Sequence, residues 1–261
     1  MAISGALLGM AYAFAIIVAV SILLYLSKID RKIVLAVSFV TAALGILIHA
    51  PMIPLQMQSL LVNGDVGNGM PWYMATIVII VLIGSSLVIG RVFCGYACPI
   101  GALQELAYTV PTPKFAKNGD RWSTYVHIAM TLLFFALGAI WSFGLLGFLG
   151  VRDLFDLKWA SASFYIFLGF LAVGIFYYRP FCRLVCPFGL FAGFLSRWSL
   201  LKIGKGGGCD SCRRCEGKCP TGAMAGDGIA ECFLCLRCGD VCRQEAIVFK
   251  KKEASDEGKK D

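Results

Sequence analysis

The sequence predicts an all-α membrane protein of about five transmembrane helices, followed by a small cysteine-rich C-terminal module. Of its 261 residues, 58% are hydrophobic and 15% are charged, against roughly 45–50% and about 25% in an average soluble domain. Because so few polar residues cannot cover a water-soluble globule, most apolar side chains are expected to face lipid. We expect three parts: a transmembrane domain at 1–200, the module at 201–250 and a disordered charged tail at 251–261.

Five stretches without Asp, Glu, Lys or Arg are each long enough for a spanning helix, which takes about 20 residues. They predict transmembrane helices near 5–26, 33–51, 72–92, 124–148 and 160–178. The first lacks the basic start of a signal peptide, so we interpret it as a retained helix.

The basic residues between and after these helices predict the orientation of the chain. Of the 24 Lys and Arg residues, 22 fall on one side of the membrane, and only Arg152 and Lys158 on the other. By the positive-inside rule, we expect the N-terminus outside and the module in the cytoplasm, in a cell inner (cytoplasmic) membrane. We therefore interpret the net charge of +8 as a consequence of membrane topology, and expect no nucleic-acid partner.

The C-terminal module holds two cysteine runs with one spacing. The pattern C-x2-C-x2-C-x3-C occurs twice, 23 residues apart, and Pro220 follows the first run. In proteins with two 4Fe-4S clusters, three ligands of each cluster come from one run and the fourth from the other. Structural zinc would use two C-x2-C pairs and leave the x3-spaced cysteines unexplained. We therefore predict two 4Fe-4S sites, formed by Cys209, Cys212, Cys215 and Cys242, and by Cys219, Cys232, Cys235 and Cys238.

A second repeat, with a period of 88 residues, lies at the inner ends of the third and fifth predicted helices. The segment FCGYACPIG at 93–101 parallels FCRLVCPFG at 181–189, and an arginine stands two residues before each. Proline suits the first position of a helix, so we expect helices to begin at Pro99 and Pro187, with a cysteine at each N-terminus. There the helix dipole favours a thiolate.

Buried structural cysteines are the alternative interpretation of this repeat, but two copies in register favour function. We predict one shared redox or metal site at the cytoplasmic membrane surface, formed by Cys94, Cys98, Cys182 and Cys186. Soft thiolates suit a third iron-sulfur centre, a copper site or a dithiol, and the spacing does not choose among them.

Together, the two C-x3-C-P motifs and the C-terminal cysteine runs resemble the NapH-type family of membrane quinol dehydrogenases, whose relatives include NosR-type and methylamine-utilisation ferredoxin-type proteins. The resemblance covers about residues 70–250. It implies electron passage between a lipid quinol pool and a redox partner, such as an iron-sulfur or cytochrome subunit, through iron-sulfur centres. It also implies a ferredoxin-like (α+β) module, although Arg243 stands where that family usually has proline. The chain has no room for the extracytoplasmic flavin domain of the NosR-type branch, and one more predicted span than the four usual in NapH-type proteins.

Two other functions stay open at this point: a membrane-bound reductase of copper or another metal, and a non-enzymatic anchoring or assembly factor for a soluble oxidoreductase. The two histidines, His49 and His127, are predicted at opposite ends of their helices, which excludes a haem held between them. His49 is a candidate quinone contact. Arg91 and Arg179 are expected to snorkel to the membrane surface, although a cation beside a reducible cluster would raise its potential.

Overall fold

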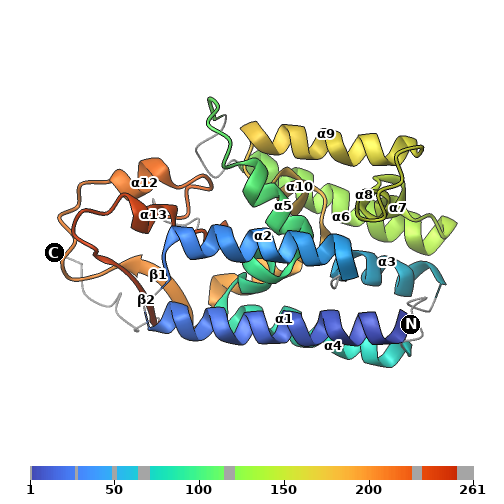
Figure 1. The fold of residues 1–261 in the computed structure, drawn as a ribbon, viewed down its shortest axis with the longest axis horizontal. Helices are drawn as coiled ribbons and strands as arrows, with labels where there is room; N and C mark the ends of the chain where they lie inside the picture. Colours follow the sequence, from blue (N-terminus) through green and yellow to red (C-terminus); the bar gives the residue numbers. More distant parts are fainter. Residues whose placement is uncertain are drawn as a thin grey trace.

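The computed structural model describes residues 2–26, 29–48, 52–63, 71–114, 121–224 and 231–251. The described chain is mostly helical, with long helices along the molecule and the C-terminal module at one end, opposite the N-terminus (Figure 1). The long helices are α1 (Ala2–Tyr25), α2 (Arg31–Ile48), α4 (Trp72–Ile89), α6 (Arg121–Trp141) and α9 (Ala162–Phe176).

Each of the five predicted ranges overlaps one of these helices, but the helices differ in length. Two are long and apolar enough to cross a bilayer, at Trp72–Ile89 and Trp122–Trp141. Shorter apolar helices occupy Gly9–Tyr25, Ile53–Val62 and Ala162–Phe176. A mainly helical chain with two candidate spans is therefore established, while the number of five spans stays a prediction.

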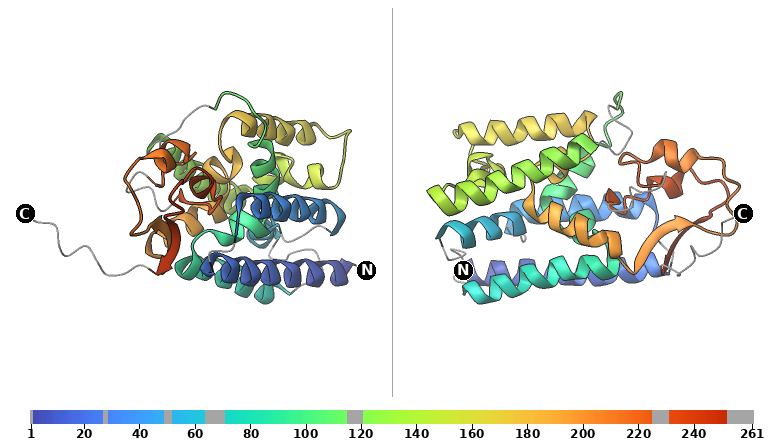
Figure 2. Two further views of the ribbon diagram at one scale, coloured as in Figure 1. Left: turned by 60° about the vertical axis from the view of Figure 1, so that its left-hand side comes forward. Right: turned by 180° about the vertical axis from the view of Figure 1, so that it is seen from behind.

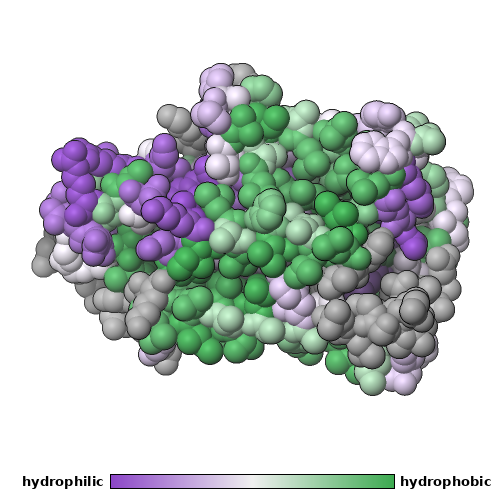
Figure 3. Space-filling view, viewed as in Figure 1, coloured by the Kyte–Doolittle hydropathy of each residue, from purple (hydrophilic) through white to green (hydrophobic). Residues whose placement is uncertain are grey.

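The surface of the long helices is apolar. Large side chains such as Phe39, Ile80, Leu132 and Ile140 are well exposed. Figure 3 shows mostly hydrophobic residues over the helical part and a largely hydrophilic module at one end. Soluble monomers rarely expose apolar patches of this extent, whereas a lipid-embedded protein requires them.

Two details of the helical part differ from the sequence prediction. The fourth predicted helix, 124–148, is interrupted: α6 ends at Trp141, Ser142 has a left-handed backbone with φ of 50°, and a separate turn, α7 (Leu145–Phe148), follows. An additional helix, α3 (Ile53–Asn63), lies where a loop was expected. The side chain of Gln58 on α3 accepts a hydrogen bond of 2.6 Å from the Leu146 amide, which stabilises the start of α7.

Short helices follow both C-x3-C-P motifs. As expected, α5 (Pro99–Ala107) and α11 (Pro187–Leu195) begin at the two prolines, and each has nine residues. The motifs precede them as a π-helical turn, η1 (Phe93–Ala97), and as α10 (Pro180–Leu184). Helix α5 packs against α2 and α9, and α11 packs against α4 and α6, so both motifs are held inside the bundle (Figure 2).

The C-terminal module is small. A 3-10 turn, η2 (Ser196–Trp198), leads into β1 (Leu201–Lys205), which pairs antiparallel with β2 (Ile247–Lys251) in a two-stranded ribbon. Between the strands lie two single-turn helices, α12 (Arg214–Lys218) and α13 (Arg237–Asp240). One ribbon and two single-turn helices among the described residues do not clearly establish the expected ferredoxin-like (α+β) class, which stays a prediction. Most of the predicted tail, 252–261, lies outside them.

Candidate functional site: three groups of four cysteines

The first group, here called the outer site, is the set Cys209, Cys212, Cys215 and Cys242. One cavity of the module is lined by all four of these cysteines, three from the first run and one from the second. Cys212 is exposed to solvent. Four thiols around one cavity are the donor set that a 4Fe-4S cluster takes.

The second group, here called the inner site, is the set Cys219, Cys232, Cys235 and Cys238, and a separate cavity is lined by all four. Burial raises the pKa of the Cys238 thiol, and the nearby sulfurs of Cys235, Cys232 and Cys219 raise it further. Iron binds cysteine as the thiolate, so a cluster at this site would displace the protons of these thiols. Among the described residues, no three His, Cys, Asp or Glu side chains converge on a single metal ion.

The loops around both sites share an unusual backbone. Positive φ values of 56–57° occur at Ser211 and Arg213 in the first loop, and 23 residues later at Leu234 and Leu236 in the second. Residues other than glycine seldom adopt this conformation, which costs about 1–3 kcal/mol each. Because it recurs in register, the strain belongs to the repeat, where it curls each C-x2-C-x2-C segment around its cavity.

The third group consists of the membrane cysteines Cys94, Cys98, Cys182 and Cys186, which are all buried. Burial raises the pKa of the Cys186 thiol, and Cys182, Cys94 and Cys98 raise it further. The Gln104 side chain on α5 donates a hydrogen bond of 3.4 Å to Cys182 Sγ, so the two motifs are in direct contact. The expected effect of the helix N-termini on the thiols is present but is not the largest one. At Cys98, the amides of Gly101 and Ile100 do lower the pKa, but burial raises it by more.

The two motifs also pack in the same way. A Cβ on Gly101 would overlap the carbonyl oxygen of Cys94, and a Cβ on Gly189 would lie 2.6 Å from the carbonyl oxygen of Cys182. Each glycine therefore allows the new helix to close onto the first cysteine of its own motif. The 88-residue sequence repeat is a repeat of structure.

A buried carboxylate that was not predicted lies between the membrane motifs and the module. Glu105 on α5 has no exposed side-chain surface, and three arginines and a tyrosine surround it. Its oxygens lie 2.7 Å from Arg31 Nη2, 2.8 Å from Arg237 Nη2, 3.1 Å from Arg179 Nη2 and 2.7 Å from Tyr178 Oη. We call these five residues the arginine cage. Burial alone raises the pKa of the Glu105 carboxyl, but Arg179, Arg237 and Arg31 together hold it well below its usual value.

Sequence reasoning missed Glu105 because its partners are 73 to 132 residues away. One signal was present: Glu105 is the only acidic residue between Asp65 and Asp120, in a stretch rich in apolar residues. A lone acid in such a segment calls for a buried cationic partner.

The expectation that Arg91 and Arg179 snorkel is wrong. Their exposed fractions are 6% and 1%, and both guanidinium groups lie over the ring of Phe233, at 4.7 and 5.0 Å from its centroid. Arg179 also donates hydrogen bonds to the carbonyl oxygens of Cys94 and Gly95. The arginines of the repeat thus join the membrane motifs to the module.

Direct contacts connect the inner site to the first membrane motif. The Tyr96 hydroxyl donates a hydrogen bond of 2.6 Å to the Leu234 carbonyl oxygen, between two inner-site cysteines. Gly95 approaches the module so closely that a Cβ there would lie 2.7 Å from the Phe233 carbonyl oxygen. Arg31 donates a hydrogen bond of 2.9 Å to the carbonyl oxygen of Cys235. The module is therefore docked through its inner-site loop.

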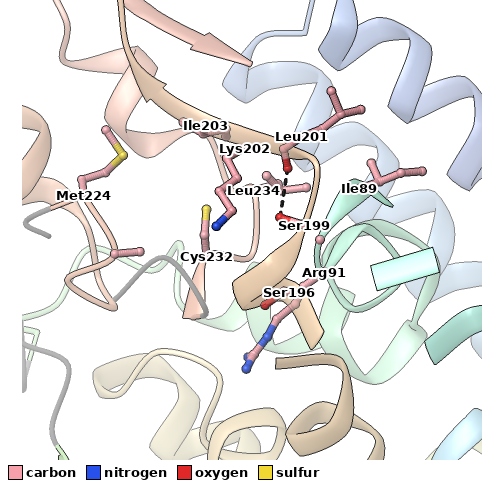
Figure 4. Close-up of a pocket in the computed structure, with 12 residues that line it drawn as sticks. Ile89, Arg91, Ser196, Ser199, Leu201, Lys202, Ile203, Met224, Cys232 and Leu234 are labelled. Atoms are coloured by element: carbon pink, nitrogen blue, oxygen red, sulfur yellow. Dashed lines mark hydrogen bonds between the residues drawn. The ribbon is translucent and has the colours of Figure 1, made fainter. Parts of the chain in front are cut away.

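A small cavity lies on the other face of this junction, between the end of α4 and β1. It is lined by Arg91, Ser196, Ser199 and the inner-site Cys232, among others, and Ser199 Oγ donates a hydrogen bond of 3.2 Å to the Leu201 carbonyl oxygen (Figure 4). His127 on α6 is buried, with Nε2 2.8 Å from the carbonyl oxygen of Cys186. His49 lies outside the described residues.

Comparison with known proteins agrees with the repeat. A family model described as a 4Fe-4S binding domain matches the chain twice, at residues 70–118 and 159–206. Each match contains one C-x3-C-P motif. No solved structure matches the chain.

Three curated proteins illustrate the relationship. Uncharacterized protein MJ0749 of Methanocaldococcus jannaschii is 31% identical over 67% of this chain and 71% of its own length. Regulatory protein NosR of Stutzerimonas stutzeri is 30% identical over 59% of this chain but only 24% of its own. Putative electron transport protein YccM of Escherichia coli is 26% identical, over 64% and 53%. By these matches, the chain belongs to the family of protein MJ0749 and carries the 4Fe-4S binding domain twice.

Proposed function

We propose that this protein is a membrane electron-transfer subunit that passes electrons between a lipid quinol pool and a redox partner, as the quinol-oxidising component of a NapH-type oxidoreductase. The observation that supports this proposal most is the direct contact between the first membrane motif and the inner-site loop. In this contact Gly95 packs against Phe233, and Tyr96 donates a hydrogen bond to Leu234. This contact places two groups of four cysteines on either side of one tightly packed junction. Similarity to a protein named for electron transport supports the proposal.

Three groups of cysteines would hold the centres: the outer site, the inner site and the membrane cysteines. When bound by thiolates, 4Fe-4S clusters accept and release single electrons. The chain itself holds the thiols at set positions. It buries the four membrane cysteines and two of the inner-site cysteines, Cys219 and Cys238, and leaves Cys212 of the outer site open to solvent. A soluble or membrane-attached iron-sulfur or cytochrome subunit would approach at that exposed end.

The proposed topology has five spans, an external N-terminus and a cytoplasmic module in the inner membrane. The 22-to-2 distribution of basic residues and the apolar surface of the long helices support it. The two basic residues on the opposite side, Arg152 and Lys158, both pair with Asp156, at 3.6 and 3.1 Å.

The test uses the full-length protein, purified without oxygen in lipid nanodiscs. Iron should amount to about 12 atoms per chain for three clusters. After dithionite reduction, addition of a short-chain quinone should restore the visible charge-transfer absorbance. Full iron content with no reoxidation by quinone would overturn the quinol assignment, and stoichiometric copper at the membrane cysteines would favour a metal reductase.

The role of the membrane cysteines is tested by changing Cys98→Ser and Cys186→Ser together. This variant should lose about four iron atoms and its reoxidation by quinone, while the iron of the module stays. The matched control is Gly84→Ala in α4, where a Cβ meets nothing within 4 Å. Unchanged iron and unchanged reoxidation in the double variant would contradict a shared centre.

A further inference from the structure

The two cysteine sites of the module differ in the charges around them. The inner-site cavity is lined by two members of the arginine cage, Tyr178 and Arg237. A third member, Arg31, donates a hydrogen bond to the carbonyl oxygen of the ligand residue Cys235. The cage is therefore in contact with the inner site and not merely near it.

The cage carries a positive charge that water screens only in part. It contains three guanidinium groups and one carboxylate, which is a net charge of 3 − 1 = +2. The exposed side-chain fractions are 12% for Arg31, 1% for Arg179, 15% for Arg237 and 0% for Glu105. Charges interact several times more strongly in such surroundings than in bulk water.

The repeat leaves a further cation on the same side. The position 88 residues after Glu105 is Gly193, so the second copy of the motif has no acid to match it. The guanidinium of Arg91 occupies the space where a Gly193 side chain would begin. Arg91 faces the ring of Phe233, which follows the inner-site Cys232. Glu105 of the first copy thus partly neutralises Arg179, whereas the second copy has Gly193 in place of an acid beside Arg91.

The outer site is surrounded by charges of a different kind. Arg213 and Arg214 are exposed, and Lys205 is paired with Glu216 at 2.6 Å. Asp210, beside Cys209, opposes the remaining positive charge. Interactions between exposed charges are weakened by water and by salt.

We propose that the arginine cage makes the inner site the preferred place for an electron, so that its reduction potential is more positive than that of the outer site. This inference rests on the proposed function, since it assumes that both sites hold clusters. Reduction adds one negative charge to a site, and buried cations stabilise that charge more than exposed ones do. At redox equilibrium, a single electron shared between the two sites therefore resides mainly at the inner site, and its exchange between them transfers no bond or proton. Electrons therefore collect beside the membrane cysteines.

The test is a redox titration of the full-length protein in nanodiscs, followed by electron paramagnetic resonance. A couple that disappears in the Cys98→Ser/Cys186→Ser variant belongs to the membrane cysteines and is set aside. Two couples then remain, and Arg31→Gln should lower the reduction potential of the more positive one. The expected change is about tenfold in the ratio of reduced to oxidised site, which corresponds to about 59 mV for one electron. The other couple should not move. Glu105→Gln, which removes the negative charge of the cage, should shift the more positive couple upward.

Two controls separate charge from fold. Lys32→Gln removes the same charge from the neighbouring exposed position and should leave both couples unchanged. Arg31→Lys keeps the charge and should restore the wild-type potential even if the Arg31→Gln protein is less stable. If the two module couples had the same potential, or if Arg31→Gln and Lys32→Gln shifted them equally, the inference would be overturned. Reoxidation by quinone would be unaffected by that outcome. Separate couples that respond as stated, in a protein that quinone does not reoxidise, would overturn only the proposed function.

Discussion

The arginine cage makes a sharp stability prediction for Glu105→Ala. The carboxylate of Glu105 accepts five contacts of 2.7 to 3.2 Å from four groups. After its removal, three buried or nearly buried guanidinium groups have lost their shared counter-ion. Loss of one partner from a buried ion pair costs about 3–5 kcal/mol. Because contacts in one network are not additive, we expect this range for the whole cage and not for each arginine.

The assay is denaturation of the protein in detergent, combined with hydrogen exchange across the inner-site loop. The cage joins α2, α5, the segment before α10 and the module, so the loop should lose protection together with global stability. Glu216→Ala is the matched control, because it removes a glutamate whose ion pair with Lys205 is equally short but partly exposed. Its effect should be small. A Glu105→Ala protein that unfolds within about 1 kcal/mol of wild type would refute the assigned role of the cage, since that is far below the cost of unpairing a buried charge.

Three further outcomes are expected. Gly95→Ala should lower the free energy of unfolding by about 1–3 kcal/mol and loosen the module, because its Cβ would lie 2.7 Å from the Phe233 carbonyl oxygen. Unfolding measurements should show no such loss for Gly84→Ala. Equal stability of the two variants would count against the tight junction. Tyr96→Phe removes the hydrogen-bond donor to the buried Leu234 carbonyl and should lower the stability of this junction by about 1–3 kcal/mol. This loss should appear as faster hydrogen exchange at Leu234, and exchange as slow as in wild type would contradict the prediction. A fluorescent protein fused to the C-terminus should be active and an alkaline phosphatase inactive, because the module is expected in the cytoplasm; the reverse pattern would invert the topology.

Several features of this protein could be read from the sequence because they depend on local geometry. Proline has a fixed φ and no amide hydrogen, so Pro99 and Pro187 could be expected to start helices, as they do. Residues that are two or three positions apart can curl around one space, and the cysteine spacing in the module encodes this directly. The same cysteine sets that the spacing groups together line two separate cavities.

The tertiary structure decided what the charged residues of the membrane part do. A hydropathy pattern can predict that Arg91 and Arg179 stand at the ends of helices, but not that the module covers them. In the same way, Ser142 interrupts a long apolar stretch because Gln58 of another helix stabilises the new turn. The cage around Glu105 joins residues from four separate segments of the chain. The physical reason is common to all three: burial and the choice of ionic partner depend on which distant segments come together, and no local spacing records that.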